Sequence, residues 1–208
     1  MHFKSVPLML HRGLLQDDEK ISALMSSPYA VPYLLSSEML NTDVLYRSHI
    51  HGQGHIERVM LLGAMIAMNE KLNIKDTRLL LFACSYHDIG RRDDTKDDYH
   101  GLRSAELITK YNLTDIPGDL GRDETAMLKA AIATHSMHDD TLDRNAERFR
   151  VPPCELEHCR QLCFCLKDAD NLDRVRLHDL DTKHLRHTES IKMADTAEYI
   201  FRRYQEYR

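Results

Sequence analysis

The sequence predicts an all-α protein that folds as a single helical bundle. Apolar residues recur three and four positions apart along most of the 208 residues, which is the spacing of one helix face. No segment shows the sustained alternation of apolar and polar residues that predicts a β-strand. An apolar fraction of 42% in a chain of this length allows one substantial core. We therefore expect one domain over residues 1–208.

The N-terminal half predicts four helical segments, at residues 17–26, within 28–50, at 54–72 and at 76–87. The first opens with acidic residues, which favour a helix N-terminus, and carries Ile21 and Leu24 on one face. Pro32 interrupts the second segment, so any helix there is short. The third places Val59 and the apolar residues that follow it on one side. The fourth ends near Gly90, as helices commonly end at a glycine.

The C-terminal half predicts five further helices, at residues 100–111, 122–135, 155–167, 169–180 and 184–207. In the first of them Leu102, Ala105 and Ile108 recur at helical spacing, and the others show the same periodicity. Polar segments separate the helices. Loops are expected at residues 91–98 and 112–121, and irregular structure is expected from His138 to Pro153.

Composition and charge exclude several classes of function. A formal net charge of −5 provides no basic field for duplex nucleic acid, so we expect no such partner. No stretch approaches the roughly 20 apolar residues of a membrane span, and the N-terminus lacks the pattern of a signal peptide. We therefore expect a cytoplasmic protein without a membrane partner. Small anionic substrates are compatible with the charge if a local positive site binds them.

The five cysteines are expected to be reduced thiols. Four of them lie in CELEHCRQLCFC, at Cys154, Cys159, Cys163 and Cys165. Their spacing differs from the paired CxxC turns that are typical of zinc and iron–sulfur sites. Cys159 and Cys163 instead share a helical stripe with Leu162, which predicts that they are buried as small hydrophobic side chains.

Thirteen histidines are many for this length, and several stand where helices are predicted to begin or end. With nearby aspartates they form a set of candidate ligands: His55, His87, Asp88, His100, His135 and Asp170. Imidazole and carboxylate groups suit divalent metals such as Zn, Mn, Fe, Co and Ni. An adjacent His–Asp pair at a helix end can serve one metal, because the two side chains diverge and meet at a point beyond the end.

The order and context of these residues resemble the HD-domain superfamily of metal-dependent phosphohydrolases. HIERV, which begins at His55, is similar to the first-histidine helix of that family, and YHDIG is similar to the motif that gives the family its name. DADNLDR is similar to the late motif in which the second aspartate, here Asp170, is a ligand. The resemblance covers about residues 50–180. It implies a single HD-domain helical bundle whose core is flanked by N- and C-terminal helices.

The resemblance also implies one or two divalent metal ions per chain, with Mn, Fe, Zn, Co, Ni or Mg as candidates. Four residues would hold the first ion: His55, His87, Asp88 and Asp170. His100 and His135 fall where many members hold a second ion that the HD aspartate bridges. His138 is a weaker alternative ligand, and His51 is expected to support the site or lie at the surface. Other histidines, among them His187, have charged neighbours and are expected to be solvated.

The implied function is hydrolysis of a nucleotide or another small phosphoester by a metal-activated water. A metal lowers the pKa of bound water from about 15.7 towards 7 and neutralises the phosphoryl oxygens. Asp88 would orient or deprotonate this water. Four cationic residues after the HD motif, Arg91, Arg92, Lys96 and Arg103, are expected to bind the substrate's negative charge. The alternative for these four is a solvated loop of mixed charge.

Two alternative functions stay open at this point. Some HD proteins hold a di-iron pair with the same ligand types and activate oxygen to cleave a C–C or C–P bond, and imidazole accepts iron as readily as zinc. The other alternative is a catalytically silent, metal-binding regulatory module. The HD subfamily that cleaves cyclic di-GMP has a paired histidine followed by a GYP loop. This activity is disfavoured here, because Ser136 follows His135 and no GYP loop comes after it.

Overall fold

The computed structural model describes residues 5–115 and 120–207, which contain eleven α-helices and no strand. This confirms the predicted all-α class. In chain order the helices are α1 (Val6–His11), α2 (Glu19–Met25), α3 (Ala30–Glu38), α4 (Gln53–Asn69), α5 (Ile74–Tyr86), α6 (His100–Lys110), α7 (Arg122–His135), α8 (Leu142–Phe149), α9 (Leu156–Leu172), α10 (Thr188–Ile191) and α11 (Ala194–Glu206).

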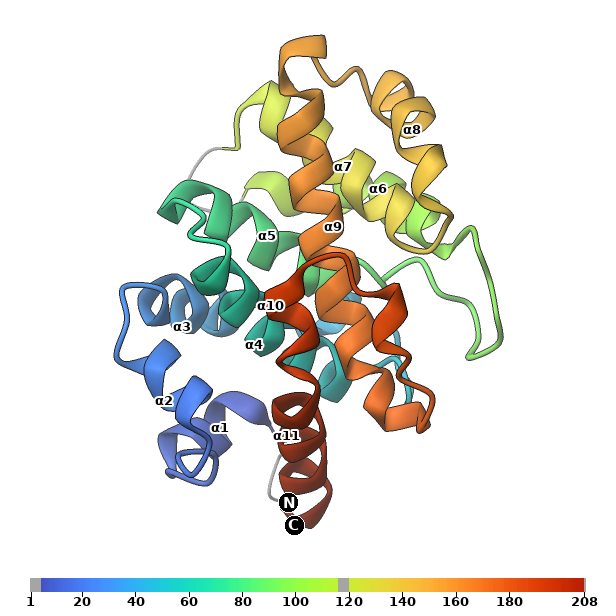
Figure 1. Ribbon diagram of the computed structural model, residues 1–208. Helices are drawn as coiled ribbons and strands as arrows, with labels where there is room; N and C mark the ends of the chain where they lie inside the picture. The colour runs from blue at the N-terminus through green and yellow to red at the C-terminus, as the bar shows by residue number, and fades with distance from the viewer. Residues whose placement is uncertain (1–4, 116–119, 208) are drawn as a thin grey trace.

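Helices α4 and α9 form the centre of the bundle. They pack against each other, α5 packs against both, and α7 packs against α9 and α5 (Figure 1). Every residue of α4 from His55 to Ala67 is buried, as expected for a helix that is surrounded on all sides. Figure 1 shows α1, α2 and α3 on one side of this centre, α6 and α8 on the other, and α11 below.

Most predicted helices are present with small shifts at their ends. The segments expected at 17–26, 54–72, 76–87, 100–111 and 122–135 correspond to α2, α4, α5, α6 and α7. The short helix expected within residues 28–50 is α3. It accommodates Pro32 in its first turn, where backbone N–H groups have no helical partner to lose.

Three expectations about the C-terminal half were wrong. Residues from Leu142 form α8 instead of irregular structure, with Leu142, Asn145 and Ala146 buried. The expected break between residues 167 and 169 is absent, because the polar residues there are buried with tertiary partners and α9 continues to Leu172. The expected helix at 169–180 is therefore replaced by the end of α9 and the short 3₁₀ helix η5 (Asp173–Leu177).

The two ends of the chain also differ from the prediction. The expected helix at 184–207 divides into α10 and α11. The helix α1 was not predicted, although its N-cap Ser5 and the following proline at position 7 are typical start signals. No helix within residues 5–115 and 120–207 has both the length and the apolar character to cross a bilayer.

All five cysteines are free thiols. Cys159 and Cys163 are buried on α9, as the helical stripe predicts, and Cys165 on α9 and Cys84 on α5 are also buried. Cys154 is exposed, because it lies before the first turn of α9 rather than on its apolar face. Burial raises the pKa of the Cys159 and Cys163 thiols to about 12, so these groups act as hydrophobic packing.

Candidate metal centre

The first group of predicted ligands converges at one point between α4, α5 and α9. His55 Nε2 and His87 Nε2 lie 3.2 Å apart. Asp170 lies in the last turn of α9, and its Oδ1 is 3.4 Å from His55 Nε2 and 3.7 Å from His87 Nε2. Both imidazoles are fully buried, whereas the Asp170 side chain is 27% exposed. Of these three side chains, Asp170 is therefore the one that solvent reaches.

A second group meets the first at Asp88. His100, the first residue of α6, places Nε2 at 2.9 Å from Asp88 Oδ1, and His135, the last residue of α7, places Nε2 at 3.7 Å from the same oxygen. The two nitrogens are 2.9 Å apart. The other oxygen of Asp88, Oδ2, faces the first group at 3.6 Å from His55 Nε2. Asp88 thus lies between the two groups with one oxygen towards each.

Backbone carbonyls fix the orientation of three of the imidazoles. The Nδ1 atoms of His87, His100 and His135 each lie 2.5–2.9 Å from the carbonyl oxygen of the residue three positions earlier. A carbonyl oxygen can only accept a hydrogen bond, so Nδ1 carries the proton in each ring. The lone pair of Nε2 therefore points into the site, which is the form that binds a metal.

His55 is oriented by a carboxylate instead. Its Nδ1 lies 2.8 Å from Oδ2 of Asp173, the first residue of η5. Arg58 holds the same carboxylate from one turn further along α4, with Nε and Nη2 donating at 2.6 and 2.9 Å. Burial would raise the pKa of Asp173, but Arg58 and His55 hold it at about 2. Asp173 was not among the predicted site residues, although its place three residues after Asp170 is a usable signal.

These donors fit a divalent cation. At both Nε2–Nε2 contacts two lone pairs face each other, an arrangement that repels unless a cation lies near them. Asp88 Oδ1 is buried without a hydrogen-bond partner among the described residues, although His100 Nε2 lies 2.9 Å away, so this oxygen is available to a cation. The groups His55–His87–Asp170 and His87–Asp88–His135 each bring three donor atoms within 4.8 Å of one another.

The charges at the site favour the same chemistry. Burial would raise the pKa of Asp88 and Asp170, but the surrounding imidazoles hold each pKa well below its usual range. Burial would lower the pKa of His87, but the same two carboxylates raise it, which shows that they attract positive charge to this point. Burial lowers the pKa of His135 to about 4, so this ring is neutral at pH 7, as a ligand must be.

Two glycines allow the ligand-bearing helix ends to approach. A Cβ on Gly90 would lie 2.4 Å from the backbone nitrogen of Ser104 and 2.5 Å from the carbonyl oxygen of His100. A Cβ on Gly101 would lie 2.5 Å from the Ile132 carbonyl oxygen. Because neither glycine has a side chain, α6 packs closely against the ends of α5 and α7.

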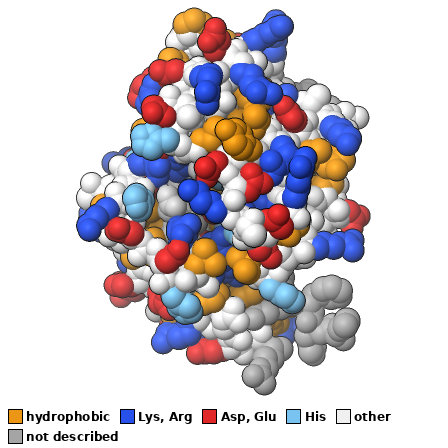
Figure 2. Space-filling model, turned by 90° about the vertical axis from the view of Figure 1, so that its right-hand side faces the viewer, with side chains coloured by type: hydrophobic (Ala, Val, Ile, Leu, Met, Phe, Trp, Pro, Cys, Tyr) orange, Lys and Arg blue, Asp and Glu red, His pale blue; other side chains and the backbone are white. Residues whose placement is uncertain are grey.

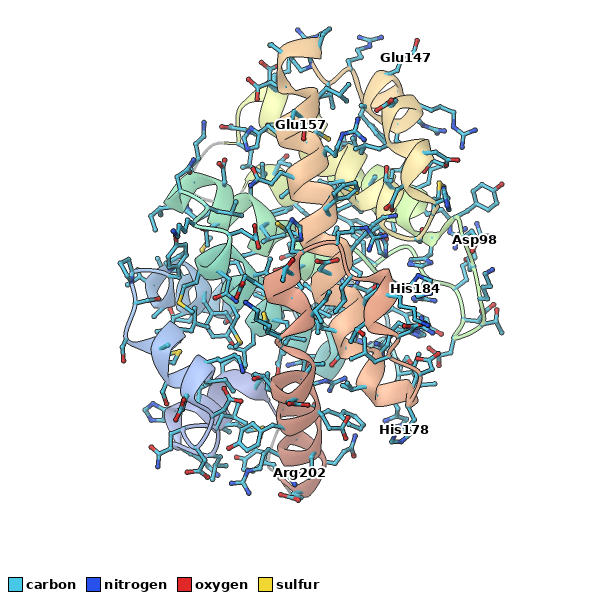
Figure 3. All side chains as sticks on the ribbon, in the orientation of Figure 1. Asp98, Glu147, Glu157, His178, His184 and Arg202 are labelled. Atoms are coloured by element: carbon cyan, nitrogen blue, oxygen red, sulfur yellow. The ribbon has the colours of Figure 1, made fainter. Side chains whose placement is uncertain are left out.

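The four cationic residues expected to bind substrate are not all close together. Arg91 Nε donates to Asp88 Oδ2 at 2.9 Å, so this residue contacts the candidate centre directly. Arg103 donates to the Gly90 carbonyl at 2.9 Å and pairs with Asp97. Lys96 is 88% exposed and lies 3.8 Å from Asp98, which Figure 3 places in the loop that projects from the bundle. Arg92 is exposed.

The remaining histidines of interest have separate surroundings. His51 is buried, places Nδ1 2.8 Å from Asp94 Oδ1, and has its ring centroid 5.9 Å from that of His55. His138 is exposed and pairs with a neighbouring acid, so it lies outside both groups. His187 was expected to be solvated, but this was wrong: it is partly buried, with Nδ1 2.8 Å from Oδ2 of Asp168.

Comparison with known proteins gives one match. The family model described as HD domain matches residues 52–175, which is more than half of the chain. No curated protein and no solved structure matches. All six predicted ligands lie within the matched residues, and so do Arg58 and Asp173.

Proposed function

The chain belongs to the HD-domain family, and from this premise we propose that it is a metal-dependent phosphohydrolase that acts on a nucleotide or another small phosphoester. HD domains bind divalent metals, and the chain has His and Asp groups that can hold one. The proposal goes further in naming the reaction. Its main support is the pair of Nε2–Nε2 contacts, at 3.2 and 2.9 Å, with the Asp88 carboxylate between them.

We propose the following ligands for two ions. The first would be held by His55, His87, Asp88 and Asp170. The second would be held by His100 and His135, with Asp88 shared between the ions. This assignment is supported by the position of Asp88, whose Oδ1 faces one pair of imidazoles and whose Oδ2 faces the other.

The protein groups have distinct roles in the proposed reaction. A bound divalent ion supplies a water of lowered pKa and neutralises charge on the phosphoryl oxygens. Asp88, which faces both groups, orients the attacking water. Arg91, Arg92, Lys96 and Arg103 provide positive charge for the substrate, which the net charge of −5 does not attract. Because water is the nucleophile, the reaction needs no covalent intermediate with the protein.

Metal analysis and a substrate panel test this proposal together. The purified full chain, supplied with Mn²⁺, should retain divalent metal in elemental analysis and release phosphate or pyrophosphate from one member of a phosphoester panel. His87→Ala should lose metal and activity together, because it removes a proposed ligand of the first ion. His138→Ala is the matched control, since this exposed histidine lies outside both groups.

The number of ions has its own test. His100→Ala removes one donor from the second group and leaves the first intact, so the metal content should fall from two ions to one per chain. One ion per chain in both the wild type and His100→Ala would support a centre with a single ion.

The competing reaction is tested with the iron-loaded protein. Oxygen uptake coupled to substrate loss, with no phosphoester hydrolysed under any metal, would replace this proposal with the di-iron oxygenase. Retained metal with neither reaction would support the regulatory module.

A further inference from the structure

A pocket of about 420 Å³ lies beside the turn that follows the HD motif. Its walls come from this turn and from one face of α6. The lining residues are Ile89, Gly90, Arg91, Arg92, Arg103, Glu106, Leu107 and Lys110. We call this the α6 pocket. None of the six proposed metal ligands is among its described lining residues, so it is a separate space from the candidate metal centre.

The α6 face in this pocket is a continuous strip. Three of the lining residues, Glu106, Leu107 and Lys110, follow Arg103 by three, four and seven positions. At these spacings the four side chains lie along one side of the helix. Arg103 also donates from Nε to the Gly90 carbonyl at 2.9 Å, which joins the strip to the turn. Arg103 therefore holds the α6 side of the pocket to the turn.

The lining is strongly basic in a protein that is acidic overall. It contains four cations and one acid. The acid, Glu106, is already paired with Arg148 of α8 at 2.8 Å. Figure 2, which faces the side of the 91–98 loop, shows charges of both signs mixed over the surface, so basic residues do not simply cover the whole protein.

Two of the four cations are not committed to a carboxylate. Arg92 has neither an ion pair nor a hydrogen bond with the residues that the structure describes. Lys110 lies over the Tyr111 ring at 5.8 Å and has no carboxylate partner within the same residues. Both side chains are exposed, so they can reach an anion in the pocket without breaking an existing ion pair.

Arg91 connects this pocket to the candidate metal centre. Its Nε donates to Asp88 Oδ2 at 2.9 Å and its Nη1 lies 3.4 Å from the Thr95 carbonyl oxygen. A guanidinium has five N–H donors, so most of its hydrogen-bonding capacity is left for a ligand. One side chain therefore touches a proposed ligand on one side and lines the pocket on the other.

We propose that the α6 pocket binds a phosphate group of the substrate other than the one that is hydrolysed. This inference rests on the proposed phosphohydrolase function and narrows its substrate class. Guanidinium and ammonium groups bind phosphate through charge-assisted hydrogen bonds. The substrate is therefore an ester with at least two phosphate groups, such as a nucleoside diphosphate or triphosphate, with one phosphate at the metals and another near Arg92 and Lys110.

A double variant tests the assignment. Arg92→Ala/Lys110→Ala removes the two uncommitted cations without touching a proposed metal ligand. The KM of a polyphosphorylated ester should rise about tenfold or more, because charge-assisted contacts are lost, while the metal content stays unchanged. The KM of the matching monophosphate should rise several-fold less, since this ester loses the general attraction of Arg92 but has no second phosphate to place in the pocket.

The matched control is Lys20→Ala/Arg202→Ala, which removes the same charge from exposed positions on α2 and α11. This control should leave the KM of both esters unchanged. An equal rise in KM for the monophosphate and the polyphosphate in Arg92→Ala/Lys110→Ala would overturn the assignment, because it would reflect general electrostatic attraction.

Direct binding separates this inference from the proposed function. Tripolyphosphate is titrated calorimetrically into the full chain with metals chelated. We expect tripolyphosphate to bind the wild type and the Lys20→Ala/Arg202→Ala control but not Arg92→Ala/Lys110→Ala. This result would support an anion site in the pocket even if no ester is hydrolysed and the proposed function fails. Equal binding to all three proteins overturns it. Loss of tripolyphosphate binding with no change in either KM shows that the pocket serves a separate ligand, which overturns the substrate assignment.

Discussion

Asp173 determines which nitrogen of His55 faces the candidate centre. Its carboxylate accepts from Nδ1, so the Nε2 lone pair is directed towards His87. Partners of this kind raise the basicity of a metal-binding imidazole and fix its orientation. Arg58 in turn holds Asp173 and lies between this carboxylate and the aromatic rings of Phe201 and Tyr204, at 5.3 and 4.9 Å. The orientation of His55 therefore depends on residues from α4, η5 and α11.

We expect Asp173→Asn to weaken metal binding by about 10- to 100-fold. The substitution preserves size but removes the charge that His55 and Arg58 share. Titration of Mn²⁺ into the full chain measures the change without relying on activity. Asp179→Asn is the control, since this exposed aspartate pairs with Arg174 at the surface. Equal affinity in the two variants would show that Asp173 does not act through His55.

The candidate ligands could be found from the sequence because they share a local signature. Each is a histidine or aspartate at or near the end of an apolar helix, in an order that matches the HD motifs. Arg58 and Asp173 do not share this local signature. Their role in orienting His55 follows from a contact between positions 115 residues apart. Periodicity describes which face of a helix is apolar, but does not specify which buried carboxylate meets which imidazole.

At the scale of elements, the junction of α9 with α10 depends on a titratable pair. Asp168 is fully buried, accepts from the backbone N–H of Arg186 and His187, and also contacts Nδ1 of His187. This hydrogen bond to Asp168 raises the pKa of His187 above its ordinary value. His187 is the N-cap residue of α10, so the pair ties α10 to α9.

The pair predicts how stability changes with pH. Because the pKa of His187 is higher in the folded protein than in the unfolded chain, its interaction with Asp168 stabilises the fold fully below the unfolded pKa of about 6.5. This contribution is lost as the pH rises through the folded-state pKa. We therefore expect the free energy of unfolding to fall relative to that of His187→Ala as the pH rises above about 6.5. Urea unfolding at pH values below and above this point measures the difference. A constant difference at all pH values would contradict the assignment.

The close approach of α6 to the end of α5 gives a second prediction at this scale. Gly90→Ala should destabilise the protein by about 1–3 kcal/mol or more, because the added methyl group meets α6 backbone atoms that cannot move aside locally. It should also reduce bound metal, since relief of the clash displaces His100. Gly121→Ala is the control: its added carbon meets only the end of the Glu124 side chain. Urea unfolding and elemental analysis report the two effects.

Helix boundaries show where sequence patterns are sufficient. Helices α5, α6 and α7 have wide apolar faces and their extents were predicted closely. Helix α9 was divided wrongly because Lys167 and Asp168 look like a polar break. Both are buried: Lys167 binds the Met137 carbonyl oxygen at 2.6 Å and Asp139 at 2.5 Å. A tertiary network thus keeps a polar stretch helical, which no local propensity reports.

At the scale of the whole molecule, the proposed ligands come from α4, α6, α7, α9 and the end of α5. His55 and Asp173 are 118 positions apart in the chain, yet they lie in direct contact. The all-α class and the identity of the ligand types follow from the sequence. The convergence of the proposed ligands at one place depends on how the helices cross. Without the family resemblance, the sequence does not determine these crossings.

The long separation between His55 and Asp173 has a consequence for folding kinetics. Contacts between distant segments form after the local helices, because closing the intervening loop costs chain entropy. Metal affinity should then develop only after the transition state for folding. We expect saturating Mn²⁺ to slow unfolding in stopped-flow experiments and to leave the refolding rate nearly unchanged. Refolding that accelerates with Mn²⁺ would mean that the ligands already meet in the transition state, and that the ion helps to nucleate the bundle.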